Sequence, residues 1–141
     1  MTTNLPAHRH THPKGPRPSV PNCPFCAIVA GRAPATVMRT WSDAIAIVPL
    51  NPVTPGHWLV IPRTHVPDAA TDPGVSAAVM RRAAEVIAHT GDDCNLITSI
   101  GAPATQTVFH LHLHIVPRAT GDGLPLPWTP QQATGTEMTA R

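Results

Sequence analysis

The most informative stretch of this 141-residue chain is Phe109-His110-Leu111-His112-Leu113-His114-Ile115-Val116-Pro117-Arg118. Its histidines alternate with apolar residues, so on a β-strand all three imidazoles point to one face and the leucines and isoleucine to the other. Same-face neighbours on a strand lie roughly 6.5–7 Å apart, close enough for two imidazoles to hold one tetrahedral group. Three imidazoles buried side by side without partners would destabilise an ordinary core strand. The pattern therefore predicts a chemical site.

The composition argues against several classes of protein. Ten basic and eight acidic residues give a net charge of +2, too small for a protein that coats nucleic acid or a membrane surface. No apolar stretch approaches the roughly 20 residues of a transmembrane helix, and the N-terminus lacks the apolar centre of a signal peptide. We therefore expect one cytoplasmic domain with no nucleic-acid and no membrane partner. Three cysteines, two of them in Cys23-Pro-Phe-Cys26, indicate metal or redox use rather than a disulfide scaffold.

The two ends of the chain have the composition of tails. Residues 1–21 are rich in proline, histidine, threonine and basic residues, which predicts a disordered segment. It contains His8-Arg9-His10-Thr11-His12, but its spacers are polar, so we interpret it as solvated. With a C-terminal tail at 129–141, the folded domain is expected at 22–128.

The core of the chain has the pattern of an α+β domain. Short apolar runs between turn residues predict strands, and an apolar stripe at helical spacing predicts one long helix. The expected strands are Thr36–Arg39, Ala44–Val48, Trp58–Pro62, Asn95–Ile100 and Thr107–Val116, and the expected helices are a short Ala27–Gly31 and a long Ser76–His89. Most consecutive strands can pair, which predicts a roughly five-stranded antiparallel sheet with the long helix on one side.

Three blocks of the chain resemble the signatures of one known family. They are Cys23-Pro-Phe-Cys26-Ala-Ile-Val-Ala-Gly31-Arg-Ala-Pro34, Asn51-Pro-Val-Thr-Pro-Gly-His-Trp-Leu-Val-Ile-Pro-Arg-Thr-His65, and Ser99-x-Gly101-x-x-x-x-Gln106-Thr107-Val108-x-His110-x-His112-x-His114-Ile115-Val116-Pro117-Arg118. The last of these resembles the signature of the histidine triad (HIT) proteins, and the resemblance covers residues 23–128. It implies a HIT-like nucleotide-binding fold, usually a homodimer. It also implies a hydrolase or nucleotidyltransferase that acts on nucleoside monophosphates in P–N or P–O–P linkages.

The resemblance implies a role for each histidine of the site. His112 matches the nucleophile that forms a covalent nucleotidyl-histidine at the α-phosphorus, and neutral imidazole is a competent nucleophile at pH 7. One of its ring nitrogens must be unprotonated, while the other donates to a fixed acceptor such as a backbone carbonyl. His114 matches the donor to the phosphate oxygens, and Gln106 and Thr107 match catalytic polar groups beside it. The implied nucleotide-binding set for a purine nucleotide is Asn51, Ser99, Gly101, Gln106, Thr107, His112 and His114.

A metal site is implied by the same resemblance. In members with the Cys-x-x-Cys opening, the first histidine of the triad tends to bind zinc. The ligand set here would be Cys23, Cys26, His65 and His110, which is the usual composition of a closed tetrahedral zinc site. Four protein ligands leave no open position, so this zinc is expected to be structural and the chemistry to need no cofactor. The alternative for the cysteines is a reduced or redox pair, for which the expected βαβ context is missing.

Two departures from the family pattern keep other functions open. Pro49 stands where the family usually has an acidic or amide residue for the ribose, and Ser99 where an amide commonly contacts the phosphate. One alternative is therefore a nucleotide-binding module with weak or no turnover. Others are a zinc-binding scaffold without nucleotide and, for the histidine run alone, a catalytic zinc held by two imidazoles. If the protein is an enzyme, the sequence does not distinguish a phosphoramidase from a dinucleoside polyphosphate hydrolase. His57, which follows a Pro-Gly pair, is interpreted as a structural turn residue that hydrogen-bonds the backbone.

Overall fold

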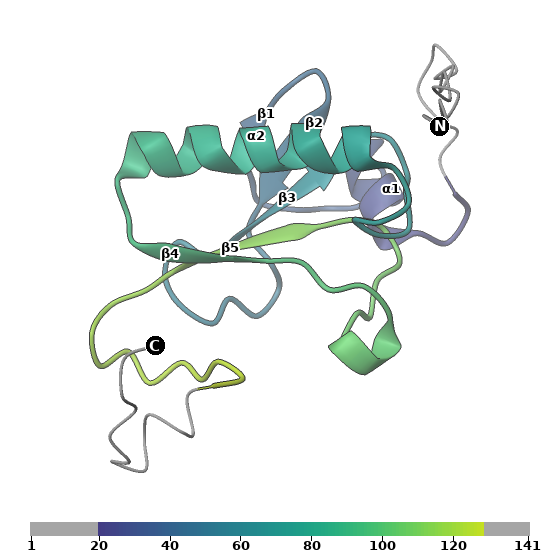
Figure 1. Ribbon diagram of the computed structural model, residues 1–141. Helices are drawn as coiled ribbons and strands as arrows, with labels where there is room; N and C mark the ends of the chain where they lie inside the picture. Colours follow the sequence, from purple (N-terminus) through teal and green to yellow (C-terminus); the bar gives the residue numbers. More distant parts are fainter. Residues whose placement is uncertain (1–19, 129–141) are drawn as a thin grey trace, which may run out of the picture.

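The structure, a computed structural model, describes residues 20–128, where an antiparallel sheet carries a long helix on one face (Figure 1). The helices are α1 (Pro24–Val29) and α2 (Pro73–Thr90), with a short 3-10 helix at Ala102–Ala104. The strands are β1 (Val37–Thr40), β2 (Ala44–Ile47), β3 (Trp58–Pro62), β4 (Cys94–Ile97) and β5 (Leu113–Pro117). Their order across the five-stranded sheet is β1-β2-β3-β5-β4. The predicted α+β class, with its antiparallel sheet, long helix and short N-terminal helix, is confirmed.

The long helix α2 forms because both of its ends are capped and one of its faces is apolar. The Asp72 carboxylate accepts hydrogen bonds from two backbone N–H groups of the first turn, at 3.0 and 3.3 Å. Gly91 ends the helix with a φ of 73°, a conformation that glycine adopts at little cost. The helix begins at Pro73 rather than at the predicted Ser76, because the cap is Asp72 and proline suits the first helical position.

Apolar side chains cover both faces of the sheet. On one face, Val79, Ala83 and Val86 of α2 join a buried cluster that includes Val60 and Ala46. On the other face, α1 contributes Phe25 to a second buried cluster. Its members are Phe25, Ile45, Ile47, Leu59 and Ile61. Because consecutive residues of a strand face opposite ways, burial on both faces explains why β2 and β3 are apolar throughout. The segment with the two cysteines thus packs on the face opposite α2.

The histidine run departs from its predicted conformation. Only Leu113–Pro117 belongs to a strand, so the predicted strand at Thr107–Val116 is wrong for its first half, and of the three histidines only His114 lies on β5. Before β5 the backbone leaves the ladder, because the N–H of Leu111 donates to the carbonyl of Val66, 2.8 Å away. The alternation of side chains is nevertheless kept. Leu111, Leu113 and Ile115 are buried in the α2-side cluster, while the rings of His110 and His112 contact Phe25 on the other face.

The other predicted boundaries shift by a few residues. The short helix begins at Pro24 rather than Ala27, because Cys23 Sγ accepts a hydrogen bond from the N–H of Cys26 and caps the first turn. The strand predicted at Asn95–Ile100 is Cys94–Ile97, where its pairing with β5 stops. The order of pairing also differs from the sequence order, since β3 pairs with β5 instead of with β4. Trp58–Pro62 is found as predicted.

Some predictions fall where the structure gives no description. Residues 1–19 and 129–141, and with them nearly all of the expected tails and the run His8-Arg9-His10-Thr11-His12, lie outside the described residues. Within residues 20–128, neither helix has the length and apolarity needed to cross a membrane.

Candidate functional site

Four side chains from distant parts of the chain converge in a cysteine-histidine cluster, Cys23, Cys26, His65 and His110. The cysteines come from the start of α1, His65 follows β3, and His110 precedes β5. The four ligand atoms lie within 4.8 Å of one another, with the Sγ atoms at 3.3 to 3.5 Å from histidine Nδ1 atoms. Edges of about 3.5 Å are those of a tetrahedron with Zn–S bonds of about 2.3 Å and Zn–N bonds of about 2.0 Å. The structure thus brings together the residues predicted to bind zinc.

The protonation of His110 suits a metal ligand. Its Nε2 lies 2.9 Å from the carbonyl oxygen of Pro62. Because a carbonyl only accepts, the ring proton sits on Nε2 and the Nδ1 lone pair faces the cysteines. The side chain is fully buried, and burial lowers the pKa of His110 to about 4, so the ring is neutral at pH 7. Burial also lowers the pKa of His65 and raises the pKa of Cys26, so metal binding there would release thiol protons.

A second cluster holds the predicted nucleophile. The rings of His112 and His114 are neighbours, with centroids 5.2 Å apart. His112 Nδ1 lies 2.8 Å from the backbone carbonyl oxygen of His110. The carbonyl requires the proton on Nδ1, which leaves the lone pair of a neutral ring on Nε2. His112 therefore has the tautomer that nucleophilic attack needs, fixed by the carbonyl that the sequence argument anticipated in kind.

A chain of hydrogen bonds sets the opposite tautomer in His114. The backbone N–H of Val53 donates to His57 Nδ1 at 3.0 Å, and His57 Nε2 lies 2.9 Å from His114 Nδ1. Because a backbone N–H can only donate, the proton of neutral His57 is on Nε2 and is donated to His114 Nδ1. The remaining proton of His114 is therefore on Nε2. Burial, with smaller contributions from His112 and His57, lowers the pKa of His114 to about 4, so at pH 7 it is a neutral hydrogen-bond donor.

His57 has a larger part in the site than its sequence position indicated. The predicted backbone hydrogen bond exists, but the same ring also contacts His114 and is only 5% exposed. Gly56 places it: with φ at +83°, its backbone passes so close to β5 that a Cβ would lie 3.1 Å from Pro117 Cγ. The contact arises because β3 pairs with β5, which sets Leu59 opposite His114 and brings the nearby His57 to the same place. The order of the strands along the chain does not reveal this pairing.

Phe25 is a further contact that the sequence argument missed. Its ring stands nearly edge-on to those of His110 and His112, with centroids 5.8 and 5.1 Å away. Phe25 lies between the two cysteines of Cys23-Pro-Phe-Cys26. The helix segment that carries two metal-ligand candidates therefore also supports the ring of His112, the predicted nucleophile, from one side.

Gln106 serves the loop that precedes the histidines. It is buried, its Oε1 accepts from the N–H of Gly101 at 2.8 Å, and its Nε2 donates to the carbonyls of Pro67 and Val108 at 2.7 and 3.1 Å. Both ends of the amide are thus used within the protein, as is the N–H of Gly101. These hydrogen bonds hold the loop in place, and the contacts of Gln106 and Gly101 with a nucleotide stay predictions.

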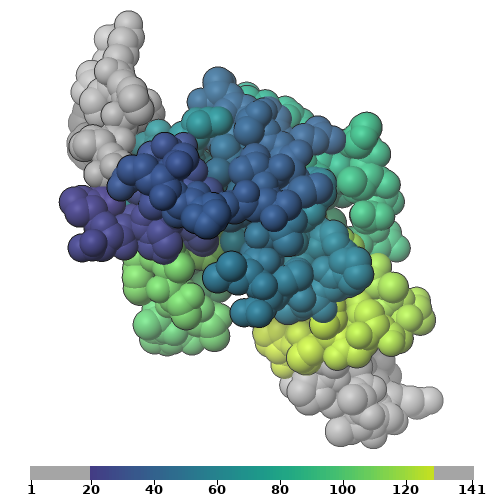
Figure 2. Space-filling view, turned by 180° about the vertical axis from the view of Figure 1, so that it is seen from behind, coloured from purple at the N-terminus to yellow at the C-terminus, as the bar shows by residue number. Residues whose placement is uncertain are grey.

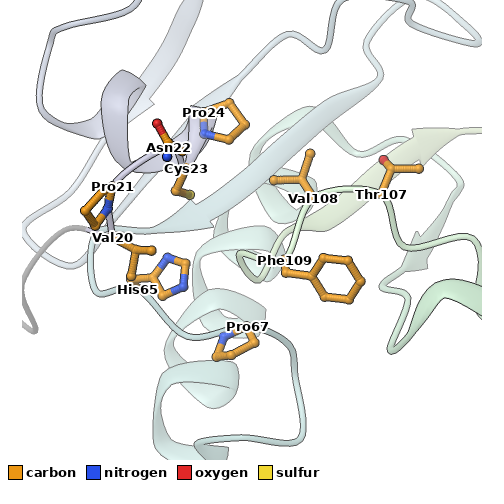
Figure 3. A pocket seen from close by; sticks show the side chains of 10 residues that line it. All are labelled: Val20, Pro21, Asn22, Cys23, Pro24, His65, Pro67, Thr107, Val108 and Phe109. Carbon is orange, nitrogen blue, oxygen red and sulfur yellow. The ribbon is translucent and has the colours of Figure 1, made fainter.

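Of the other predicted binding residues, Thr107 and Ser99 line two separate recesses, and Asn51 lines neither of them. Thr107 is exposed and lines a hollow of about 450 Å³ beside the cysteine-histidine cluster, across from Cys23 and His65 (Figure 3). Ser99 lines a separate pocket of about 350 Å³ together with His57 and His114, which we call the His114 pocket. Asn51 is exposed in the β2–β3 connection. Neither His112 nor His114 lines the larger hollow, whereas His114 lines the His114 pocket, so this pocket borders the histidine pair.

The comparisons with known proteins agree with this geometry. Residues 30–121 match the family model described as HIT domain. An uncharacterized HIT-like protein of Mycobacterium tuberculosis is 39% identical over 110 residues, which cover 72% of this chain and 75% of that protein. An adenylylsulfatase of Arabidopsis thaliana, HINT3, is 36% identical over 109 residues, which cover 73% of this chain and 55% of the plant protein.

Solved structures share the fold. A Zn-bound histidine triad family protein from Mycobacterium smegmatis is 42% identical, with a TM-score of 0.65 over 74% of this chain and 81% of that one. A HIT family hydrolase from Clostridium thermocellum is 31% identical, with a TM-score of 0.67 over 77% of this chain and 98% of that one.

Proposed function

The chain belongs to the HIT family, and on that premise we propose that it cleaves nucleotides at the α-phosphate through a covalent nucleotidyl-His112 intermediate. The observation that carries the proposal is the pair of opposite tautomers: His112 presents a lone pair at Nε2 and His114 presents a proton at Nε2. One ring can attack phosphorus while its neighbour donates to the phosphate oxygens. This is the pairing that phosphoryl transfer requires.

The reaction follows from these protonation states. The lone pair of His112 Nε2 forms the bond to the α-phosphorus, and the bond from phosphorus to the leaving nitrogen or oxygen breaks. The leaving group takes that electron pair and a proton from solvent water, and the water that later attacks phosphorus returns a proton to solvent as the Nε2–phosphorus bond breaks. Meanwhile His114 Nε2–H stabilises the charge on the phosphate oxygens. Attack by water then releases the nucleoside monophosphate and restores His112.

We propose a structural role for zinc in the cysteine-histidine cluster. Its four ligands would leave no open position for substrate, so a bound metal would anchor α1 to the segment before β5 without entering the reaction. Support comes from the neutral His110 whose Nδ1 faces the cysteines and from the Zn-bound protein of Mycobacterium smegmatis. From the family we also propose a purine nucleotide substrate and a homodimer.

The second candidate is a nucleotide-binding module with little turnover. It is favoured by Pro49, whose side chain offers no hydrogen bond to a ribose, and by Ser99 at the place of a longer amide. Against it stands the fixed tautomer of His112, because binding alone requires no free lone pair on that ring.

Intact-mass measurement after rapid mixing with adenosine 5′-phosphoramidate separates the two candidates. The enzyme should show a transient species one adenylyl group heavier. His112→Asn, which keeps a side-chain N–H for the carbonyl of His110 but lacks Nε2, should show none, and the exposed His89→Gln should behave like the unchanged protein. If neither adduct nor released nucleotide forms while the protein still binds AMP, the binding module is correct.

A further inference from the structure

The cysteine-histidine cluster has two buried side chains and two that are partly exposed. Cys26 is 3% exposed and His110 is fully buried. Cys23 and His65 are half-buried, and both line the hollow of about 450 Å³ beside the cluster. Figure 3 shows the two side chains on the wall of this hollow. A metal ion that reaches the cluster through the hollow therefore meets Cys23 and His65 first.

The same hollow lies where the described part of the chain begins. Val20, the first residue that the structure describes, lines it. Figure 2 shows the start of the described chain, in purple, against the segment around residues 107–109, in green, and both segments contribute to the lining. The residues that precede Val20 are therefore attached at the rim of the opening to the metal cluster.

Residues 8–12, His-Arg-His-Thr-His, form a motif that the proposed function does not use. Five of the nine histidines lie in the cysteine-histidine cluster or around His114, and His89 lies in the last turn of α2. The remaining three are His8, His10 and His12, which we call the leading histidines. Imidazole is the commonest metal-binding side chain, and short histidine-rich tracts bind metal ions. Three imidazoles also leave one of the four positions around a zinc ion open to a further ligand.

The chain between His12 and Val20 is long enough to bring the leading histidines to the hollow. Eight residues span up to about 28 Å, whereas a hollow of about 450 Å³ is only about 10 Å across. Tethering over such a length gives an effective concentration in the millimolar range. A metal ion on the leading histidines is therefore presented to Cys23 and His65 at a far higher concentration than an ion in bulk solution.

The balance of charge favours transfer from the leading histidines to the cluster. Residues 1–20 contain one lysine and two arginines but no aspartate or glutamate, so a divalent cation bound there keeps its full charge beside other cations. In the cluster, the thiolates of Cys23 and Cys26 neutralise that charge, and thiolate is a favoured ligand of zinc. The leading histidines therefore hold the ion weakly, whereas the cluster holds it tightly.

We propose that the leading histidines form a second site for a divalent transition metal ion, zinc above all, which captures the ion and passes it through the hollow to the cysteine-histidine cluster. The metal–nitrogen bonds to the leading histidines break as bonds to the two Sγ atoms and the two imidazole nitrogens of the cluster form. The two thiol protons go to solvent water, and the leading imidazoles are released neutral. This inference rests on the proposed zinc in the cluster and is independent of the His112 reaction.

Cobalt(II) is the probe for this transfer, because its bonds to thiolate absorb in the near ultraviolet and its bonds to imidazole alone do not. The full chain, reduced and freed of metal, is mixed with the cobalt complex of nitrilotriacetate, whose open positions accept imidazoles. The rate at which thiolate–cobalt absorption appears is compared with that of the triple variant His8→Gln/His10→Gln/His12→Gln. The control is Thr2→Gln/Thr3→Gln/Thr11→Gln, which changes the same segment equally often but keeps its histidines.

The histidine variant should load its cluster about tenfold or more slowly than the control. All three proteins should reach the same final absorption, because the cluster itself is unchanged. Equal rates for the two variants would overturn the inference, and any metal on the leading histidines would then be an adventitious ion only. Absence of thiolate–cobalt absorption in every protein would overturn the zinc assignment as well, while the intact-mass measurement would still decide the reaction of His112.

Discussion

His110 and His114 lie four residues apart, and burial lowers the pKa of each to about 4, yet they present opposite atoms to their surroundings. His110 Nε2 donates to the carbonyl of Pro62, so its Nδ1 lone pair is available to a metal. His114 Nδ1 accepts a hydrogen bond from His57 Nε2–H, so its own proton is on Nε2 and is available to a phosphate. The difference comes from the neighbour of each ring and not from the ring itself. The carbonyl oxygen beside His110 leaves that ring with a lone pair for a metal. The N–H group that faces His114 leaves that ring with an N–H to donate to a ligand.

His112 lies between them in the sequence, and its replacement should have the largest effect on activity of the three histidines. Replacing it by asparagine should lower kcat by about 10⁴-fold or more, because removal of a nucleophile abolishes the covalent path. The affinity for AMP should change little, since the hydrogen bond to the carbonyl of His110 can persist. Steady-state turnover and AMP titration of the same preparation measure the two quantities. Retained turnover in His112→Asn would show that another group attacks.

Metal removal tests the His110 end of the histidine run, where we expect a bound zinc to stabilise the fold. If zinc occupies the cysteine-histidine cluster at about 1,000 times its Kd, its loss costs about 4 kcal/mol of unfolding free energy and lowers Tm by about 15 °C. Thermal denaturation with and without a chelator measures this. Cys26→Ser should mimic the chelator and lose its response to it, while Cys94→Ser, which lies outside the cluster, should respond like the unchanged chain. Equal Tm values with and without chelator would contradict the zinc assignment.

Acid should destabilise the His114 end in a defined pH range. The folded pKa of about 4 is below the unfolded value of about 6.5, so the unfolded chain takes up the proton first. The contribution of His114 is therefore complete above about pH 6.5 and is lost as the pH falls toward 4. The full shift corresponds to about 3 kcal/mol, reduced to about 2 because the ring is partly exposed. Urea unfolding at several pH values gives the free energy of unfolding as a function of pH. Between pH 6.5 and 4 this free energy should fall less steeply for His114→Asn than for His89→Gln. An equally steep fall in both variants would rule out His114 as the origin.

The donor role of His57 predicts the smallest effect. In His57→Asn the amide can replace Nδ1 but is too short to replace Nε2, so His114 loses its fixed tautomer and kcat should fall about tenfold. In His57→Gln the longer amide can donate to His114 Nδ1, and kcat should recover. ¹⁵N chemical shifts of His114 report its tautomer directly. Equal rates and equal shifts in the two variants would leave His57 with a packing role only.

Local patterns in the sequence were sufficient for the fold class, and together with the family resemblance they named the metal cluster and the pair of His112 and His114. The apolar runs located the strands, and the spacing of the cysteines and histidines, read with the family resemblance, named the residues that the structure brings together at the metal cluster. The alternation in the histidine run placed the imidazoles on one face even though only His114 lies on a strand. Alternation reports the direction of side chains, which an extended segment keeps without a ladder.

Long-range pairing accounts for what the sequence did not predict. The contact between His57 and His114 follows from β3 pairing with β5, and such pairing depends on the whole sheet. The internal use of the Gln106 amide depends on Pro67, which is 39 residues away. The tautomers of His110 and His114 were also beyond reach, because each is set by one hydrogen-bond partner and not by the residue type; for His112 only the kind of acceptor was anticipated.

His110 contributes its side chain to one cluster and its backbone carbonyl to the other. Any amino acid at this position supplies the carbonyl, whereas only a ligand supplies the nitrogen. In evolution the two properties can therefore separate: a lineage that exchanges the cysteines and His110 for well-packed apolar residues keeps the acceptor that orients His112, provided that the backbone stays in place. Variation at this position changes how the domain is held together before it changes what the domain does.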